Sequence, residues 1–356
     1  MADIQRQFEQ FDDEIRLTRL KENKELIQKR DVILDKLRKA FAQLRGEGQT
    51  VPTFEFINQG SYEMGTGIHP AEGQDYDIDV GLKFNCAKGD YPNPVDLKEL
   101  VAKALEDHTD LGTEIRRSCV TVKYTRDGEQ AFHVDLAVYA YDNPDHAWKR
   151  LFIAKGKLGA DEKNRAWEES DPDGLIDWVE KRFTGKEQDQ FLRIIRALKR
   201  WKTEKFKTDG QNAPTGIGLT VAAGEWFRPC VNHNAFAVRT RCDDLEALSG
   251  FVATLVSKFY VVGTKQDGTP LYRLTVPVPV APGADIFMKM SHGQMTTFRE
   301  RLLQIKEKLD KATRDPDAVT ACQTLRGEFG PLFPVPEKSS TASSGGRAVA
   351  GGGISA

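Results

Sequence analysis

Apolar residues recur at helical spacing in the first part of the chain. Residues 3–45 contain neither proline nor glycine. Within them, Leu26, Ile33, Leu37, Phe41 and Leu44 follow one another at intervals of seven, four, four and three residues, which places them on one face of an α-helix. The pattern predicts a single long helix that runs as a spine along the molecule.

The period changes to that of β-strands between residues 50 and 140. Alternating or β-branched stretches predict strands at VPTFEFINQGS, YDIDVGLKF, SCVTVKYT and AFHVDLAVYAY. The last two are joined by Asp127 and Gly128, which are typical turn residues, and residues 95–107 have a helical pattern. Strands, a helix and further strands predict a mixed sheet with helical cover.

Beyond about residue 160 the pattern is mostly helical. Helices are predicted over residues 172–183, 188–206, 215–227, 244–260 and 290–312. We therefore expect an α+β protein with a sheet-bearing lobe over residues 1–165, which includes the spine helix, and a helical lobe over residues 166–336. Residues 337–356 are rich in Ser, Gly and Ala, and this composition predicts a flexible tail.

Composition places the chain among ordinary soluble proteins, with 39% hydrophobic and 29% charged residues. No stretch approaches the ~18 uninterrupted apolar residues of a transmembrane helix. The first residues also lack the basic and then apolar order of a signal peptide. We expect a cytoplasmic monomer.

Charge and cysteine usage exclude two further classes of protein. A net charge of −2 is unlike that of a protein that wraps duplex nucleic acid, which needs a basic surface. The five cysteines are scattered and form no CxxC pair, so a zinc ribbon or a disulfide framework is not expected. An enzyme of this charge that handles nucleotides is expected to act on mononucleotides.

Two carboxylates share one face of a predicted strand. Asp77 and Asp79 are two residues apart, so they project together, while Ile78 and Val80 point into the core. Adjacent carboxylates repel each other unless a cation lies between them. A DxD pattern alone is more typical of a solvated strand face.

A third carboxylate makes a metal site the better interpretation. Asp135 lies on the face opposite to Val134, Leu136 and Val138 of another strand. Three acids on two strands of one sheet form a set of hard oxygen ligands of the kind that Mg²⁺ prefers. Two such ions roughly 4 Å apart can clamp the attacking and leaving oxygens of a phosphoryl transfer. His133 shares the face of Asp135 and is interpreted as a packed strand histidine.

A Gly-Ser pair precedes the carboxylates. Gly60 and Ser61 end the first predicted strand, where backbone N–H groups and a hydroxyl can hold triphosphate oxygens. The order of strand, Gly-Ser, DxD strand and later Asp strand resembles that of the nucleotidyltransferase superfamily related to DNA polymerase β.

The resemblance is closest to the bacterial cGAS/DncV-like nucleotidyltransferases, and it covers roughly residues 50–300. It rests on five segments of the sequence, which are NQGSYEMGT followed by GQDYDID, FHVDLAVY, SDP leading to Asp177-Trp178, the helix over residues 192–201, and NAPTGIGL. It implies a polymerase β-like catalytic lobe, a helical lobe, and an enzyme that joins ATP and GTP into a cyclic di- or trinucleotide with release of pyrophosphate. In this family the product serves anti-phage signalling, and we expect cyclic GMP–AMP.

The resemblance also implies roles for individual residues. Two Mg²⁺ ions, or Mn²⁺ in their place, would be held by Asp77, Asp79 and Asp135, which are thus the expected catalytic residues. Nucleotide contacts are implied for Gln59, Gly60, Ser61, Lys199 and Thr215. Thr215 stands where well-known members have the first of two serines, and Gly216 replaces the second, which removes one hydroxyl.

The helix over residues 188–206 gives Lys199 independent support. Phe191, Ile194, Ile195, Leu198 and Trp201 form its apolar stripe, and Lys199 lies at the edge, where a lysine can extend toward a cleft. The remaining basic residues of this helix are expected on its solvated face: Arg193, Arg196 and Arg200.

Alternative interpretations stay open at this level. The chain is alternatively a nucleotidyltransferase that acts on RNA 3′ ends, tRNA or a small molecule, or an inactive scaffold that binds nucleotides. Its tail, which ends in GGGISA, is either a featureless terminus or a substrate for a conjugation enzyme, as in some operons of the family. Base identity, linkage and ring size depend on pocket contacts that the sequence does not reveal.

Overall fold

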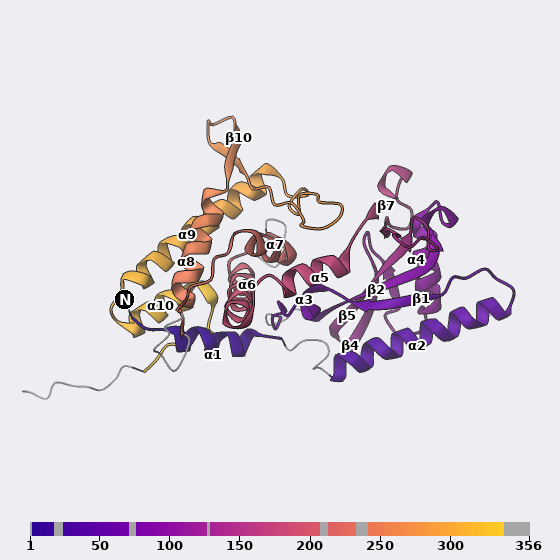
Figure 1. The fold of residues 1–356 in the computed structure, drawn as a ribbon, viewed down its shortest axis with the longest axis horizontal. Helices are drawn as coiled ribbons and strands as arrows, with labels where there is room; N and C mark the ends of the chain where they lie inside the picture. Colours follow the sequence, from indigo (N-terminus) through magenta and orange to yellow (C-terminus); the bar gives the residue numbers. More distant parts are fainter. Residues whose placement is uncertain are drawn as a thin grey trace, which may run out of the picture.

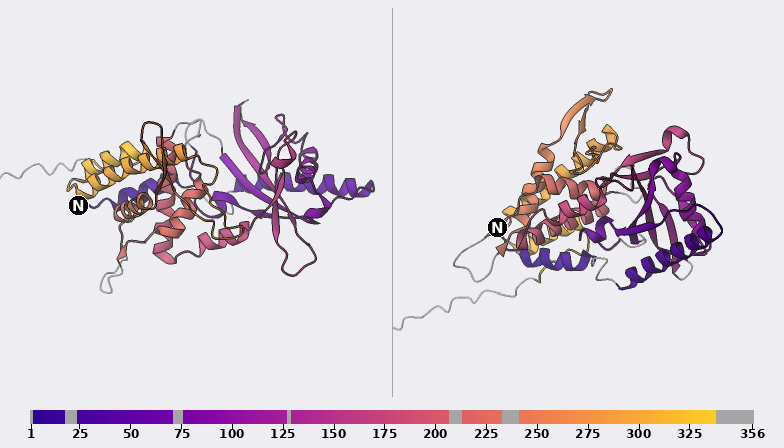
Figure 2. Two further views of the ribbon diagram at one scale, coloured as in Figure 1. Left: turned by 90° about the horizontal axis from the view of Figure 1, so that it is seen from above. Right: turned by 45° about the vertical axis from the view of Figure 1, so that its right-hand side comes forward.

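The computed structural model describes residues 2–17, 24–70, 76–126, 129–206, 213–232 and 241–337. Two lobes lie side by side along the long axis of the molecule (Figure 1). One lobe is built on a β-sheet and the other mainly on helices, and the turned views of Figure 2 show the same division. The predicted α+β fold class is confirmed.

The sheet lobe contains a mixed sheet, with seven strands among the described residues. Its main path is β1-β2-β5-β4-β3, and β6 and β7 continue the sheet beyond β5. β2 and β5 are parallel, whereas the other neighbouring strands are antiparallel. The strands are β1 Phe54–Asn58, β2 Tyr76–Ala87, β3 Thr113–Ile115, β4 Val120–Arg126, β5 Glu129–Tyr141, β6 Leu151–Lys155 and β7 Ala166–Glu169. The helices of this lobe are α2 Lys24–Gly46, α3 Gly60–Glu63, α4 Pro94–Ala104 and the 3₁₀ turns Lys88–Asp90 and Glu162–Asn164.

Alternation along β2 separates a core face from a face that lies toward the helical lobe. The core joins the alternate residues of β2 to the apolar stripe of α2: Ile78, Val80, Leu82, Phe84, Ile33, Leu37 and Phe41. The stripe predicted from the sequence is therefore confirmed at these positions of α2. The other face of β2 carries Asp79 and Lys83, and Lys83 pairs with Asp173 of the helical lobe.

The helical lobe is arranged around α6, whose predicted stripe is fully buried. Phe191, Ile194, Ile195, Leu198 and Trp201 are each 0% exposed. The elements of this lobe are α1 Gln5–Ile15, α5 Pro172–Glu180, α6 Gly185–Lys205, α7 Gly216–Trp226, α8 Asp244–Ser257, α9 His292–Arg314, α10 Ala318–Phe329 and the short strands β8 Val231–Asn232, β9 Arg241–Cys242, β10 Tyr260–Thr264 and β11 Pro270–Arg273.

The single helix predicted over residues 3–45 is wrong. α1 ends at Ile15, and Arg16 has an extended backbone with φ −70° and ψ 124°. α1 carries its own apolar stripe of Ile4, Phe8, Phe11 and Ile15, which packs in the core of the helical lobe. The N-terminal helix therefore belongs to the second lobe, and the predicted grouping of residues 1–165 is correct only from α2 onward.

The other predicted boundaries shift by a few residues. β7 completes the sheet, so the sheet lobe extends to Glu169 rather than to residue 165. Strands β6 and β7, the β10–β11 hairpin and α10 were missed, because short stretches of mixed polarity carry little periodicity. Residues 338–356, which make up nearly all of the predicted tail, lie outside the described residues.

All five cysteines are free thiols in the structure, and four of them are buried. Within the described ranges, none of the helices combines the length and the apolar character that crossing a membrane requires.

Candidate functional site

A tight loop follows β1 and lies against the DxD strand. We call residues 59–67 the glycine loop. It closes on itself through hydrogen bonds from the Thr66 amide to the Ser61 carbonyl, 2.9 Å, and from the Met64 amide to the Gly60 carbonyl, 3.3 Å. Gly60 has φ +75°, and a Cβ atom there would lie 1.9 Å from Asp79 Oδ2. Only glycine lets the loop approach this carboxylate so closely.

The carboxylates that the sequence singles out lie on neighbouring parallel strands. In the β2–β5 register, Asp79 pairs with Asp135 and Asp77 pairs with His133. Partners in a parallel pair point to the same face of the sheet, so Asp79 and Asp135 stand side by side and are both half-buried. The side chain of Asp77 lies outside the described part of the structure, but its strand position is on this same face. The predicted burial of Ile78 and Val80 behind the carboxylates is confirmed.

Asp135 is held from the next strand. The buried hydroxyl of Thr121 on β4 donates a hydrogen bond of 2.5 Å to Asp135 Oδ1. Thr121 is also the register partner of Asp135 in the antiparallel β4–β5 pair. The strands β2, β5 and β4 thus contribute Asp79, Asp135 and Thr121 to one row across the sheet.

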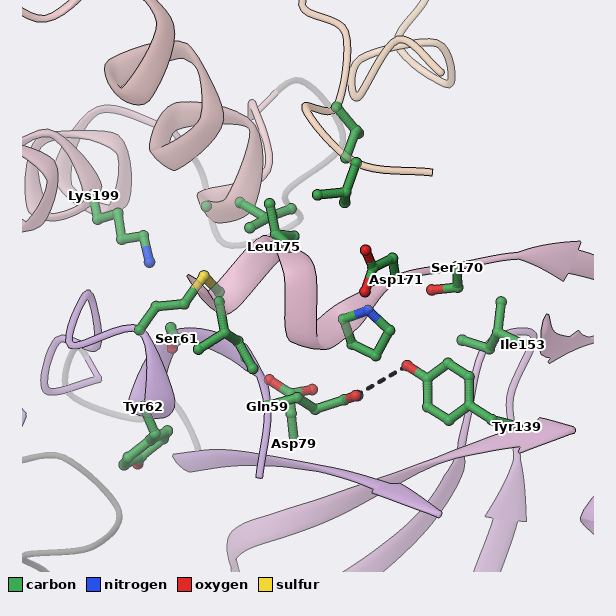
Figure 3. A pocket seen from close by; sticks show the side chains of 18 of the residues that line it. Gln59, Ser61, Tyr62, Asp79, Tyr139, Ile153, Ser170, Asp171, Leu175 and Lys199 are labelled. Carbon is green, nitrogen blue, oxygen red and sulfur yellow. Dashed lines mark hydrogen bonds between the residues drawn. The ribbon is translucent and has the colours of Figure 1, made fainter. Parts of the chain in front are cut away.

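A cavity of about 840 Å³ opens between the two lobes. On the sheet side it is lined by the glycine loop, Asp79 and Tyr139, and on the helical side by Lys199 and Gly216. Figure 3 shows Gln59, Asp79 and Tyr139 below the cavity and Lys199 extending toward it from the opposite side. The structure thus brings five of the predicted residues around one cavity: Gln59, Gly60, Ser61, Asp79 and Lys199.

Lys199 extends from α6 to the glycine loop, as the sequence predicts for a lysine at the edge of the stripe. It is 7% exposed, and its Nζ donates to the carbonyl and to the hydroxyl of Thr66, each at 2.9 Å. Burial lowers the pKa of Lys199 to about 7, and the charges of Lys202 and Arg196 act in the same direction, against an opposing effect of Asp79. An anion in the cavity would favour the charged form of this lysine.

The expectation that the arginines of α6 lie on a solvated face is wrong. Arg196 and Arg200 are each 4% exposed, and Arg193 forms an ion pair with the fully buried Asp244. Their guanidinium groups are buried against acidic side chains and backbone carbonyls, although Arg200 Nε has no hydrogen-bond partner among the described residues.

Tyr139 near the end of β5 orients the first residue of the loop. Its hydroxyl donates a hydrogen bond of 2.9 Å to Gln59 Oε1, which Figure 3 shows as a dashed line. Gly81 gives this pair room, because a Cβ there would lie 2.9 Å from Gln59 Oε1 and 3.0 Å from Tyr139 Cε2. With its carbonyl oxygen engaged, Gln59 has its amide N–H donors left for a ligand.

Thr215 is placed beside the cavity but has a structural partner. It caps α7, and its hydroxyl oxygen accepts a hydrogen bond of 3.1 Å from the Gly218 amide. Its neighbour Gly216 lines the cavity next to Lys199. A contact between Thr215 and nucleotide stays a prediction.

A loop from the helical lobe forms an apolar wall of the cavity. Its tip contributes Val278, Val280 and Pro282. Arg273 fixes the base of this loop by ion pairing with Asp285 at 2.6 Å and by donating to the carbonyls of Phe287 and Met290. A tip of this composition offers a ligand a contact surface without side-chain charge.

Comparison with known proteins bears on this geometry. Residues 54–139 match the family model for the nucleotidyltransferase domain of cyclic GMP-AMP synthase DncV-like proteins. The matched region begins at β1 and ends at Tyr139, and so it contains the glycine loop and all three aspartates. The chain carries a DncV-like nucleotidyltransferase domain.

Relatives in both sequence and structure agree with this domain. A c-di-GMP synthase of Roseivirga ehrenbergii is 23% identical over 200 residues, a match that covers 49% of this chain and 49% of the relative. This chain thus spans about half the length of that curated relative. Vibrio cholerae DncV cyclic AMP-GMP synthase in complex with nonhydrolyzable GTP has a TM-score of 0.69 at 17% identity, over 94% of this chain and 97% of the other. The Bradyrhizobium diazoefficiens CD-NTase CdnG in complex with GTP has a TM-score of 0.64 at 16% identity, over 92% and 96%. The two structural matches show that the shared fold extends through both lobes.

Three residues of the matched domain have partners at the site that sequence reasoning did not single out. Thr121 and Tyr139 stand on predicted strands, but they become significant only through the partners that the sheet brings to them. Thr66 follows the Gly-Ser pair by five residues and becomes a partner of Lys199 only when the lobes are assembled. No local pattern would have identified these three residues.

Proposed function

We propose that this chain is a cyclic oligonucleotide synthase, a nucleotidyltransferase that joins nucleoside triphosphates into a cyclic di- or trinucleotide and releases pyrophosphate. The observation that carries the proposal is the position of Asp79. It pairs in register with Asp135, lies directly against Gly60, and lines a cavity that Lys199 of the other lobe also lines. A cavity of this volume is within the usual range for small-molecule ligands, roughly 300–1,000 Å³.

The donor set fits a divalent cation. Asp79 and Asp135 offer carboxylate oxygens from adjacent strands on one face, and Asp77 has its strand position two residues away on that face. Among the described side chains, which exclude that of Asp77, no group of three potential ligands is assembled. We propose that Asp77, Asp79 and Asp135 hold two Mg²⁺ ions, with Mn²⁺ as a substitute. Bound there, the ions would supply charge neutralisation at the leaving pyrophosphate and a lowered pKa for the acceptor hydroxyl.

The protein groups around the cavity have complementary roles in the proposal. The glycine loop binds the donor triphosphate through its N–H groups, the Gln59 amide and the Ser61 hydroxyl. Lys199, which belongs to the helical lobe, binds phosphate oxygens of the same nucleotide. Residues of both lobes therefore bind one nucleotide. Asp135 accepts the proton of the acceptor hydroxyl, directly or through water.

ATP and GTP are the proposed substrates, and cyclic GMP–AMP is the proposed product. The relatives differ in this respect, because one is a cyclic AMP-GMP synthase and another a c-di-GMP synthase. We further propose that the product is a second messenger in anti-phage signalling within the cytoplasm.

Incubation of the protein with labelled ATP and GTP and with Mg²⁺ tests the proposal. The expected product is small and resistant to phosphatase, because a ring has no terminal phosphate, and mass spectrometry with linkage-specific nucleases identifies its bases and bonds. Asp79→Asn should abolish the product without unfolding the protein. Asp35→Asn is the matched control, because Asp35 is an exposed acid on α2 that pairs with Arg38 three residues away.

Two results would contradict the proposal. Full activity of Asp79→Asn would remove the metal site from the reaction. Transfer of label to RNA 3′ ends, tRNA or a small molecule, with no cyclic product, would instead establish the alternative class of nucleotidyltransferase.

A further inference from the structure

The side of the glycine loop that faces the helical lobe is covered by cations of α6. The Gly65 carbonyl accepts a hydrogen bond of 2.6 Å from Arg196 Nη1. The next carbonyl, that of Thr66, accepts a hydrogen bond of 2.9 Å from Lys199 Nζ. Two residues one turn apart on α6 therefore fix consecutive peptide groups of the loop.

Arg196 is itself fixed by the N-terminal helix. Its Nε and Nη2 donate to the two carboxylate oxygens of Asp12 on α1, at 2.6 and 2.8 Å. Both side chains are buried, with 4% of Arg196 and 5% of Asp12 exposed. A bidentate pair of this kind restricts the guanidinium to one plane, and in this plane the remaining Nη1 is directed at the Gly65 carbonyl.

The chain that follows this contact is anchored to the end of α1 as well. The Leu17 amide donates to the Gly67 carbonyl at 3.1 Å, and the His69 amide donates to the Ile15 carbonyl at 2.8 Å. α1 itself is held in the helical core by Phe8 and Phe11. The glycine loop is thus bound on its rear side to a unit made of α1 and α6, while its front lines the cavity.

Gly65 belongs to the same closed segment as Gly60 and Ser61 at the front of the loop. The loop is short and closed by the bonds from Thr66 to Ser61 and from Met64 to Gly60. Gly65 has φ +68°, a backbone conformation that glycine adopts readily, and its carbonyl accepts the Arg196 hydrogen bond.

We propose that Arg196 is a positioning residue for nucleotide binding. It sets the glycine loop through the Gly65 carbonyl, and Asp12 of α1 sets the orientation of Arg196. The inference rests on the proposed function, since it assigns to the loop the triphosphate of a nucleotide. It makes the N-terminal helix, which contributes no residue of the three-aspartate site, part of the machinery that holds the substrate.

The chain contains a matched control for this ion pair. Arg193, one turn earlier on α6, forms a similar bidentate pair with Asp244, at 2.7 and 3.0 Å. Asp244 is 0% exposed, so this pair is at least as buried on its acidic side. It holds α6 to α8, and within the described part of the chain it makes no hydrogen bond to the glycine loop. Replacement of either arginine therefore removes a buried pair, but only one replacement affects the loop.

The test compares Arg196→Lys with Arg193→Lys in the full chain. A lysine keeps the charge but cannot bind Asp12 in bidentate fashion and reach Gly65 at once. Dissociation constants are measured by calorimetry for a nonhydrolysable nucleoside triphosphate and for the corresponding monophosphate. We expect the preference for triphosphate to fall about tenfold in Arg196→Lys and to stay within about twofold of the native value in Arg193→Lys. Thermal unfolding of both variants separates loss of stability from loss of binding.

Asp12→Asn approaches the same link from α1 and serves where Arg196→Lys does not fold. Its expected effect on the triphosphate preference is in the same direction, because the amide offers one acceptor oxygen in place of two. The positioning role would be overturned if the native protein, Arg193→Lys and the folded test variant (Arg196→Lys or Asp12→Asn) all showed the same triphosphate preference. The proposed function would then remain intact. A native protein that binds no triphosphate would overturn the proposed function and this inference with it.

Discussion

Gly60 lies so close to Asp79 that a Cβ atom on the glycine would be 1.9 Å from the carboxylate oxygen Oδ2. The loop that carries the Gly-Ser pair and the strand that carries the DxD pair are therefore packed against each other directly. Glycine is needed at this position for two reasons. A side chain would collide with Asp79, and the backbone has φ +75°, which other residues rarely adopt.

Gly60→Ala should lower the synthase activity about a hundredfold, because displacement of the loop or of the carboxylate misplaces the reacting groups by roughly an ångström or more. Synthase assays with ATP and GTP measure this loss. Gly48→Ala is the matched control, because Gly48 has φ +86° but no atom within 4 Å of an added Cβ. Both variants carry a backbone strain of roughly 1–2 kcal/mol, which thermal unfolding measures. Similar activities in the two variants would mean that the contact with Asp79 is unimportant.

Thr121→Val should weaken binding of divalent cations by about 10- to 100-fold, the usual effect of removing a hydrogen bond that orients a ligand. Valine has nearly the shape of threonine, but it cannot donate the hydrogen bond of 2.5 Å that the Thr121 hydroxyl donates to Asp135 Oδ1. Binding of Mn²⁺, measured by electron paramagnetic resonance without nucleotide, reports this change directly. Thr121→Ser restores the donor and should restore most of the affinity. Native Mn²⁺ affinity in a folded Thr121→Val protein would show that Asp135 needs no such support.

The face of the sheet that carries the site was predictable from the sequence. Alternation alone places Ile78 and Val80 in the core and the aspartates on the other side, and the burial of Ile78 and Val80 agrees. The apolar stripe of α6 likewise identified a buried helix with Lys199 at its edge. Local periodicity is sufficient for these conclusions because each depends on residues within one element.

Contacts between distant segments were not predictable. Arg196 and Asp12 are 184 residues apart, and Tyr139 and Gln59 are 80 residues apart. Taken singly, a basic residue on a helix is more often solvated than paired, so Arg196 was assigned to the wrong face. The break after Ile15 is not predictable either, because Leu17 and Ile15 form backbone hydrogen bonds with the distant residues Gly67 and His69, and no local helix breaker is present.

Tyr139→Phe should raise the KM for nucleoside triphosphate about fivefold and change kcat little. The variant removes the donor to Gln59 Oε1, a hydrogen bond worth roughly 1 kcal/mol, and lets the Gln59 amide rotate away from the triphosphate. Steady-state kinetics separate the two constants. Tyr141→Phe is the control on the same strand, since Tyr141 packs with Lys149 outside the cavity. An unchanged KM in Tyr139→Phe would mean that Gln59 does not depend on this bond.

The lowered pKa of Lys199 predicts that nucleotide affinity falls as the pH rises above about 7. Burial lowers the pKa of its side chain to about 7 in the free protein, so the ammonium group that holds phosphate is lost above this pH. Dissociation constants of a nonhydrolysable triphosphate, measured from about pH 6 to about pH 9, test the trend. Lys199→Arg should remove most of the decline, because arginine stays charged throughout this range. An equal decline in the two proteins would assign the pH dependence to another group.

The lowered pKa of Lys199 also predicts that the free energy of unfolding rises with pH, whereas nucleotide affinity falls. Its pKa is 10.5 in an unfolded chain and about 7 in the folded one, so between these values the unfolded state binds more protons. The free energy of unfolding therefore rises with pH across this window, while below pH 7 the buried charge destabilises the fold at full strength. Lys202, whose pKa burial also lowers, contributes in the same direction, so the comparison must be made against a variant. Lys199→Met should be more stable than the native protein below pH 7, and its advantage should shrink by up to about 1.4 kcal/mol per pH unit above it. Urea unfolding at a series of pH values measures the difference, and a constant difference between the two proteins would mean that Lys199 keeps its ordinary pKa in the fold.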